Sequence, residues 1–337
     1  MTVKILAIES SCDETAAAIV TEGFHVQANV IASQIAVHQP YGGVVPEIAS
    51  RHHLDAIVPV AEQALADAGL TLQEVNAIAV TQGPGLIGSL LVGVSYAKAL
   101  AFAAKKPLIA VHHLEGHMLA SFLEHKDLAF PFLALVVSGS HSGLVLVTGF
   151  GEYKALGQSR DDAAGEAFDK IARALGLPYP GGPSIQAAAI CGKPIYDFPQ
   201  ALLKEGYDFS FSGLKSAVLN FLNQARMKNE PYKIEDVAAS AQQAIVEILA
   251  KKTAAAADAL GVQTIVLAGG VAANEALREK IRLYAPAHKL VYPSLVYCTD
   301  NAAMIGAAAL PKYAKADFAP LSLNATANFP ISKLFSC

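Results

Sequence analysis

The chain has 337 residues, a length that suits one large domain or two ordinary ones, and we expect two. Hydrophobic residues make up 53% of the chain and charged residues only 16%, so a well-buried core is expected. The net charge is −4 and the pI is near 6.2. These values argue against a protein that grips nucleic acid through its overall charge, so an RNA substrate would need a local basic patch or a partner.

The sequence predicts a cytoplasmic protein without a membrane segment. No apolar stretch reaches the roughly 20 uncharged residues that a membrane span needs. The N-terminal residues Met1–Leu6 run straight into a strand-like segment, without the basic region and cleavage site of an export signal. The cysteines have no paired spacing, which is typical of reduced thiols; they are Cys12, Cys191, Cys298 and Cys337.

The first part of the chain alternates strand-like and helix-like segments. Periodicity and turn residues predict strands at Val3–Glu9, Thr15–Val20, His25–Ala32, Asn76–Thr81 and Pro107–Val111. They predict a helix from Pro46 to about Asp67, an apolar helix that follows the break at Gly83–Gly85 and runs to about Lys105, and a helix at His113–Glu124.

The same pattern then restarts. Strands are expected at Phe132–Ser138, Gly143–Thr148, Tyr153–Gly157 and Thr264–Ala268. Helices are expected at Ala163–Leu175, through Ile234–Leu260, and from Asn274 onward. Such a repeat predicts two similar α/β domains that face a ligand-binding cleft. We expect the first domain at residues 1–130, with the C-terminal helix able to return to it. The second is expected at 131–337, with a helical insertion at about 160–235.

Three turns are candidates for holding phosphates. Ser10–Thr15 and Ser138–Ser142 join strands and are rich in small residues, and Gly269–Asn274 leads from a strand into a helix. Backbone N–H groups in such turns, and the start of a helix, favour negative charge. Each turn alone is also explained by ordinary turn geometry. Their matching places in a duplicated chain favour nucleotide binding, although there is neither a P-loop nor a GxGxxG fingerprint.

A histidine pair is the sharpest chemical signal. His113 and His117 are four residues apart on a predicted helix, so both imidazoles can reach one metal ion. Asp300 is the best candidate for a third ligand, although its place just before an Ala-rich helix also suits a helix N-cap. In a zinc peptidase a glutamate directly follows the first histidine, whereas here Glu115 lies two residues on, about 200° around the helix. The peptidase alternative is therefore weak.

The other histidines of these helices are not predicted ligands. His112 points elsewhere on its helix, and His52 and His53 are expected on an exposed part of theirs, solvated or in contact with RNA.

The whole chain resembles the bacterial tRNA N6-adenosine threonylcarbamoyltransferase (TsaD) family. The resemblance is carried by Ile8–Thr15, Tyr41–Glu47, Gly83–Leu86, His112–His117, Asp161–Lys170, Tyr179–Pro183, Phe209–Lys215, Gly269–Asn274 and Cys298–Asn301. These segments follow the family's order along nearly all of the chain, and together they are highly specific.

The resemblance implies the duplicated actin/Hsp70-like (ASKHA) ATPase fold, with two domains around a nucleotide-binding cleft. It implies one Fe²⁺ or Zn²⁺ per subunit, held by His113, His117 and Asp300. The implied donor is threonylcarbamoyl-AMP, with ATP able to occupy the same site, and the implied acceptor is adenosine 37 of tRNAs that read codons starting with A. The implied adenylate contacts are Val136, Val137, Ser138, Gly139, Ser140, Asp169, Gly182 and Asn274.

The resemblance also implies partners. Besides tRNA, these are a non-metal paralogue (TsaB), a small ATPase (TsaE) and a separate donor-synthesising enzyme of the TsaC/YrdC type. One loop departs from the family pattern, because Ser140 stands where a glycine is usual. Its Cβ would carry a cost if φ there were positive.

Asp13 and Glu14 are candidate catalytic residues. They lie in the first hairpin turn, where a carboxylate can accept or orient the proton of the attacking amine, although plain turn chemistry explains them equally well.

Two rivals remain for the function as a whole. A small-molecule kinase of the same fold would need no histidine pair. A non-catalytic subunit like the paralogue would lack that pair and most of the later motifs.

Overall fold

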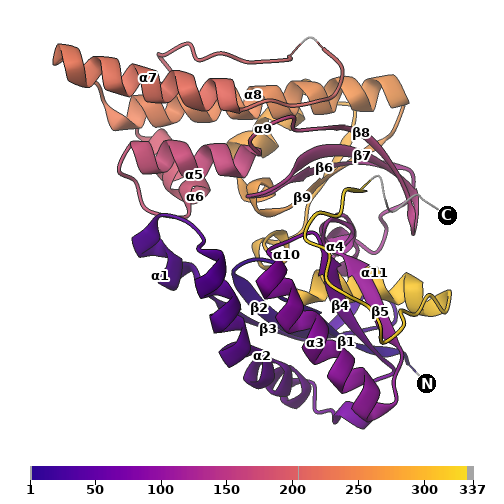
Figure 1. Ribbon diagram of the computed structural model, residues 1–337. Helices are drawn as coiled ribbons and strands as arrows, with labels where there is room; N and C mark the ends of the chain where they lie inside the picture. The colour runs from indigo at the N-terminus through magenta and orange to yellow at the C-terminus, as the bar shows by residue number, and fades with distance from the viewer. Residues whose placement is uncertain (1, 204, 332–337) are drawn as a thin grey trace. The chain divides into compact units, whose positions relative to one another are not determined.

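The computed structural model describes residues 2–203 and 205–331 (Figure 1). The chain divides into two compact units. Unit 1 comprises residues 1–38, 44–128 and 293–337, and unit 2 comprises residues 39–43 and 129–292. The segment from Pro293 onward therefore belongs with the first part of the chain, and it includes the C-terminal helix that was expected to be able to return there.

Unit 1 is built on a five-stranded mixed sheet in the order β3-β2-β1-β4-β5. Its strands are β1 (Lys4–Glu9), β2 (Glu14–Thr21), β3 (His25–Ser33), β4 (Ala77–Gly83) and β5 (Leu108–His112). β1, β2 and β3 pair antiparallel, whereas β1, β4 and β5 run parallel. The parallel strands place their carboxyl ends at one edge, which is where ligands tend to bind in such sheets.

Both faces of this sheet are covered by helices. The helices of unit 1 are α1 (Ile35–His38), α2 (Pro46–Asp67), α3 (Ile87–Ala104), α4 (His113–Leu119), α10 (Leu295–Cys298) and α11 (Ala302–Ala314), with 3-10 turns at Leu72–Glu74 and Ala120–Leu123. Leu6 and Ile8 point to the side where α2 and α3 complete the core. Ala7, between them, faces α11, where a Cβ on Gly306 would lie 2.3 Å from Cγ2 of Val20. Only glycine there lets α11 approach the sheet so closely.

Unit 2 repeats the plan of unit 1. Its sheet has the order β10-β9-β6-β7-β8, with β6 (Phe132–Val137) in the place of β1. The other strands are β7 (Ser142–Gly149), β8 (Glu152–Gln158), β9 (Thr264–Ala268) and β10 (Lys289–Val291). The first three strands of each sheet pair antiparallel and the last two parallel. The predicted duplication is therefore confirmed at the level of topology.

The helices of unit 2 are α5 (Ala164–Ala174), α6 (Gly181–Ile190), α7 (Ser212–Lys228), α8 (Ile234–Leu260) and α9 (Glu275–Tyr284), with 3-10 turns at Gln39–Tyr41 and Gly270–Ala273. The sequence patterns predicted α5, α8 and α9, but they did not give α6 and α7 as separate helices. α5, α6 and α7 lie between β8 and α8 in the chain. The Gly/Pro segment that reads as a break in the sequence is the start of α6.

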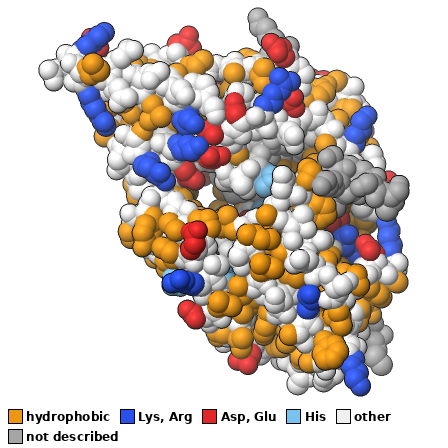
Figure 2. Space-filling model, viewed as in Figure 1, with side chains coloured by type: hydrophobic (Ala, Val, Ile, Leu, Met, Phe, Trp, Pro, Cys, Tyr) orange, Lys and Arg blue, Asp and Glu red, His pale blue; other side chains and the backbone are white. Residues whose placement is uncertain are grey.

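Among the described residues, α3 is the one helix long and apolar enough to match a membrane span by length and composition. That criterion is also met by core helices. α3 packs on β4 and α2, and Leu90, Val94 and Ala97 on one face are buried. Ile87 in its first turn and Phe102 near its end are exposed, and Figure 2 shows hydrophobic side chains gathered over the region of α2 and α3.

Candidate functional site

The histidine pair is placed by the junction of a strand with a helix. β5 ends at His112, and α4 begins at the next residue. The ring of His112 caps the new helix, because Nδ1 accepts a hydrogen bond from the backbone N–H of Leu114 at 3.2 Å. Its Nε2 lies 2.8 Å from the carbonyl oxygen of Phe329. His112 therefore has a structural role, and the buried side chains of His113 and His117 follow it on the first turns of α4.

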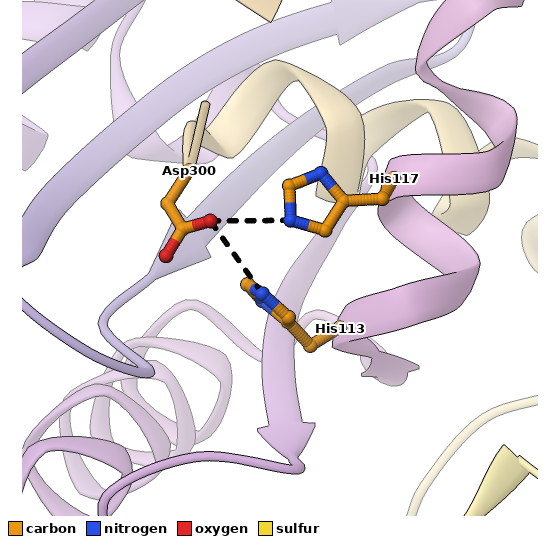
Figure 3. Close-up of side chains that lie close together, drawn as sticks. All are labelled: His113, His117 and Asp300. Atoms are coloured by element: carbon orange, nitrogen blue, oxygen red, sulfur yellow. Dashed lines mark hydrogen bonds and ion pairs between the residues drawn. The ribbon is translucent and has the colours of Figure 1, made fainter. Parts of the chain in front are cut away.

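The structure brings His113, His117 and Asp300 together (Figure 3). Nε2 of His117 lies 3.1 Å and Nε2 of His113 lies 3.5 Å from Oδ1 of Asp300. One ligand atom from each residue falls within 4.8 Å of the others. Two imidazoles and one carboxylate form a donor set that suits iron or zinc.

Asp300 does not act as the helix cap that its position suggested. The N-cap of α11 is Asn301, whose side-chain oxygen accepts from the backbone N–H of Met304 at 3.0 Å. The same side chain donates to the carbonyl of Thr299 at 2.8 Å. Asn301 therefore fixes the turn and leaves the Asp300 carboxylate directed at the two histidines (Figure 3).

Glu115 lies apart from this cluster. It is buried, and its Oε2 lies 3.7 Å from Nζ of Lys312. A peptidase-like base would have to face the histidines, so the geometry gives that alternative no support.

A buried carboxylate that the sequence patterns did not single out lies behind His113. Oε2 of Glu9 is 3.1 Å from Nδ1 of His113 and accepts from the Thr81 hydroxyl at 2.6 Å. Oε1 accepts from the backbone N–H of Ser11 at 2.5 Å. An acidic residue at the end of an otherwise apolar strand was the available signal, because such a residue needs partners inside the protein.

Electrostatics differ between the two histidines. Burial lowers the pKa of His113, but the charges of Asp300 and Glu9 outweigh it and raise that pKa to about 9. Burial dominates at His117 and lowers its pKa. Nδ1 of His117 is buried and has no hydrogen-bond partner among the described residues.

Asp13 and Glu14 lie at the turn between β1 and β2, and both carboxyl groups hold their protons more tightly than usual. Burial, followed by the charge of Asp300, raises the pKa of Asp13. Burial raises the pKa of Glu14 to about 8, with contributions from Asp13 and Asp300, although a hydrogen bond from Ser33 opposes this. Oε1 of Glu14 accepts that bond at 2.8 Å, whereas Oε2 is buried without a hydrogen-bond partner among the described residues.

The expectation that His53 is exposed is wrong. His53 is completely buried, while its neighbour His52 is exposed as predicted. Nδ1 of His53 lies 2.7 Å from the Thr15 hydroxyl, and Nε2 lies 2.9 Å from the carbonyl oxygen of Cys12. The helix turns His53 toward the sheet, where it holds both ends of the turn that carries Asp13 and Glu14.

In unit 2, the loop after β6 is braced by the start of α5. The carbonyl oxygen of Ser138 accepts from the backbone N–H of Gly165 at 3.2 Å. A Cβ on Gly165 would lie 2.5 Å from that oxygen, so glycine permits the approach. Gly139 has open space around its Cα, and Ser140 is not among the described residues with positive φ. The serine in place of the usual glycine therefore carries no such backbone strain, and its hydroxyl lies 2.8 Å from Nδ1 of His141.

The remaining candidate adenylate residues lie on neighbouring elements of unit 2. Val136 and Val137 end β6, and the 3-10 turn after Gly269 packs against both β6 and α5. Gly269 has φ of 88°, and a Cβ there would lie 2.4 Å from the carbonyl oxygen of Val137. Two requirements, positive φ and close approach, thus both demand glycine at this turn.

Asp169, Gly182 and Asn274 are positioned by local hydrogen bonds. Oδ1 of Asp169 accepts from the backbone N–H of Gly181 at 2.7 Å, which joins α5 to the start of α6. Gly182 has open space around its Cα. Asn274 caps α9 by accepting from Leu277 N–H at 3.0 Å, and its amide donates to Gln242 at 2.9 Å.

Comparison with known proteins matches nearly the whole chain to one family. The sequence profile described as "TsaD: tRNA N6-adenosine threonylcarbamoyltransferase" matches residues 25–307. A Moorella thermoacetica protein named tRNA N6-adenosine threonylcarbamoyltransferase is 57% identical over 332 residues, which cover 97% of each chain. This chain belongs to the tRNA N6-adenosine threonylcarbamoyltransferase family. The transferase prediction is thereby confirmed over its kinase, peptidase and non-catalytic rivals.

Solved structures of low identity share the fold. HypF of T. kodakarensis superposes with a TM-score of 0.62 at 16% identity, over 93% of this chain and 48% of that chain, so this chain spans about half of its length. Component A of (R)-2-hydroxyglutaryl-CoA dehydratase from Acidaminococcus fermentans has a TM-score of 0.54 at 16% identity, over 94% of this chain and 99% of that chain. These likenesses show the fold alone, and they confirm the predicted duplicated actin/Hsp70-like architecture.

Proposed function

We propose that this chain transfers the threonylcarbamoyl group of threonylcarbamoyl-AMP to N6 of adenosine 37 in tRNAs that read codons starting with A, with release of AMP. Its 57% identity to a named tRNA N6-adenosine threonylcarbamoyltransferase along 97% of both chains carries the proposal. In the reaction, the exocyclic amine forms a bond to the carbamoyl carbon, the bond from that carbon to the phosphate oxygen breaks, and the amine loses a proton.

The cluster of His113, His117 and Asp300 is proposed to hold one Fe²⁺ or Zn²⁺. Their ligand atoms already converge within 4.8 Å, and the set combines borderline nitrogen with hard oxygen donors, so the residues fit such an ion. When bound, the ion supplies Lewis-acid stabilisation of negative charge on donor oxygens. The choice between iron and zinc rests on metal analysis of the purified protein.

Asp13 and Glu14 are proposed to manage the proton of the attacking amine. A general base works best when its pKa lies near the working pH, and the pKa of Glu14 is about 8. Its Oε2 has no described hydrogen-bond partner to compete with a substrate N–H. Asp13, the less strongly perturbed neighbour, is proposed to orient the amine by accepting its second hydrogen.

The adenylate is proposed to bind unit 2. The backbone N–H groups of the loop from Val136 and Val137 through Ser138, Gly139 and Ser140 would hold the phosphate, and ATP would compete for the same place. Asp169 and Asn274 would grip the ribose or base, and Gly182 would let the backbone approach the ligand. The open space at Gly139 and Gly182 supports this assignment. A side chain at either position would meet no protein atom, so packing within the protein does not explain the glycines, whereas close approach of a ligand would.

The proposed partners are tRNA, the paralogue TsaB, the small ATPase TsaE and a TsaC/YrdC-type enzyme that makes the donor, all in the cytoplasm. A threonylcarbamoyl adenylate is an activated acyl group that hydrolyses unless it is used, so a separate enzyme must supply it close to its consumption.

A reconstituted transfer assay tests the function. Purified protein, threonylcarbamoyl-AMP, a matching tRNA transcript and the expected partners are incubated, and modified adenosine is measured by mass spectrometry. We expect product with the wild type and with His25→Ala, which changes an exposed histidine of β3, and none with His113→Ala or Asp300→Ala. Absence of product from metal-loaded wild type with every partner present would contradict the proposal and favour a small-molecule kinase.

A further inference from the structure

A fully buried glutamate touches one of the candidate metal ligands. Glu9 has a relative exposure of 0%, and it ends β1 after a run of apolar residues. A buried carboxyl group is costly unless donors satisfy it, and Glu9 has three within reach. These are the backbone N–H of Ser11, the hydroxyl of Thr81 and Nδ1 of His113.

We propose that Glu9 is the positioning residue of the metal centre: its carboxylate holds Nδ1 of His113, so that Nε2 of the same ring is the atom offered to the ion. The proposal rests on the metal site of the proposed function and extends it to a residue outside the ligand set.

The contact between the Glu9 carboxylate and Nδ1 of His113 decides which ring nitrogen carries the hydrogen. A carboxylate accepts hydrogen bonds and has none to donate, so the ring nitrogen facing it must carry the hydrogen. In the neutral ring that a metal ion binds, this leaves the lone pair on Nε2, which is the nitrogen that lies 3.5 Å from Asp300. A carboxylate behind a ligating imidazole also raises its basicity and fixes the orientation of the ring.

Glu9 is itself held in place. Oε1 is fixed by Ser11 N–H at 2.5 Å, and Oε2 is shared between the Thr81 hydroxyl at 2.6 Å and His113 at 3.1 Å. These donors come from the turn after β1 and from β4, the adjacent strand. The anchor of His113 is therefore part of the sheet and not of the helix that carries the histidine.

The second histidine lacks such an anchor. Nδ1 of His117 is buried without a hydrogen-bond partner among the described residues. The two ligands thus differ, because Glu9 forms a hydrogen bond with His113 and none is described to His117. Among the described residues, the hydroxyl of Ser11 also lies 3.1 Å from Nδ1 of His113, where it competes with Glu9 for the hydrogen on that nitrogen.

Metal affinity provides the test. The Kd for Zn²⁺ is measured by competition with a chromophoric chelator, and the absorption spectrum of bound Co²⁺ reports the ligand geometry. For Glu9→Gln we expect a 10- to 100-fold weaker Kd and an altered Co²⁺ spectrum. Glu115→Gln is the matched control, because Glu115 is equally buried on the histidine helix but lies near Lys312, and it should leave both unchanged.

A double-mutant cycle separates positioning from a purely structural role. Glu9→Gln is measured in the wild type and in a His113→Ala background, with the melting temperature of the metal-free proteins recorded alongside. If Glu9 acts through His113, the substitution costs no further affinity once His113 is absent. A structural role would lower affinity equally in both backgrounds, and that result would overturn the inference; Glu9→Asp replaces Glu9→Gln if the latter does not fold.

The outcomes are distinguishable from failure of the proposed function. Wild type that binds neither Zn²⁺ nor Co²⁺ would overturn the metal centre and the role of Glu9 with it. Wild type that binds tightly, together with Glu9→Gln of unchanged affinity and spectrum, would overturn the role of Glu9 alone.

Discussion

At the scale of the residue, burial at the turn after β1 changes the acidity of two adjacent carboxyl groups. Asp13 and Glu14 are sequence neighbours, and burial is the first cause of a raised pKa at both. Ser33 satisfies one oxygen of Glu14, whereas the other has no described partner. A carboxyl group in this condition is poised to exchange a proton near neutral pH.

Glu14→Gln is expected to slow threonylcarbamoyl transfer by about 10²- to 10⁴-fold, since the amide cannot take up the proton of the amine. The wild-type transfer rate should rise as the pH is raised, and the apparent pKa of this rise should be no higher than about 8. A cation bound at Asp300 would neutralise the charge that helps to raise the pKa of Glu14, so the apparent pKa of the rate would be lower in the metal-loaded enzyme. Single-turnover rates of the metal-loaded enzyme between pH 5.5 and 9 measure this apparent pKa.

The exposed carboxylate of Glu22 supplies the control for that experiment. Glu22→Gln should retain both the wild-type transfer rate and its pH dependence. A Glu14→Gln protein that keeps the wild-type rate and pH profile would show that Glu14 serves the turn and not the reaction.

The sequence alone predicted the histidine pair of the candidate site, but it gave neither the contact of Glu9 with that pair nor the burial of His53. The spacing of His113 and His117 implied that they share a face, and the structure places them so. Spacing gave no reason to select Glu9, because its partners Thr81 and His113 are distant in sequence. The burial of His53 was missed for a related reason, since adjacent helical positions point in different directions and only packing decides which is inside.

At the scale of elements, alternation and turn residues predicted most strands and the helices α2, α3, α5 and α8, whereas α7 was not predicted as a separate helix. α6 was missed, because Gly181, Gly182 and Pro183 have low helix propensity. Proline is tolerated in a first turn, and a Cβ on Gly181 would lie 2.4 Å from Cα of Asp169, so the glycine is retained for packing against α5. Tertiary contact overrides propensity here, and it cannot be deduced from the local sequence.

The junction of α8 and α9 depends on one nearly buried carboxylate. Glu247, 7% exposed, lies 2.8 Å from Nζ of Lys251 and 2.6 Å from Nζ of Lys280, and accepts from the Tyr284 hydroxyl at 2.7 Å. Burial alone would raise its pKa, but these three partners outweigh burial and lower it to about 2. The ion pairs therefore join the two helices as well as neutralising a buried charge.

Glu247→Gln is expected to reduce the free energy of unfolding by about 1–3 kcal/mol at pH 7, after allowance for the partly exposed lysines. The folded-state pKa is below the ordinary 4.5, so the stabilisation is complete above pH 4.5 and is lost as the pH falls toward 2. Urea unfolding at pH 7 and at pH 3 measures it, and the difference between wild type and variant should shrink at pH 3. Glu279→Gln, at an exposed position of α9, should change little; an equal loss at both pH values would contradict the role of the charge.

At the scale of the whole molecule, the candidate metal ligands come from two of the three chain segments that make up unit 1. His117 and Asp300 are separated by 183 positions, with all of 129–292 between them. An ion bound to both would hold the returning segment of α10 and α11 to α4. The free energy of metal binding would then appear as stability of the fold, because an unfolded chain rarely keeps these ligands together.

Removing the metal is therefore expected to lower the melting temperature. Zn²⁺ at 100 times its Kd stabilises the protein by about 2.7 kcal/mol, which corresponds to roughly 5–10 °C for a unit of this size. Scanning calorimetry of chelator-treated protein, with and without added Zn²⁺, measures the shift. Mg²⁺ should give none, since it prefers oxygen ligands and the cluster offers two imidazoles. A shift of the same size in His117→Ala would place the stabilising ion elsewhere, because that variant has lost the nitrogen nearest to Asp300.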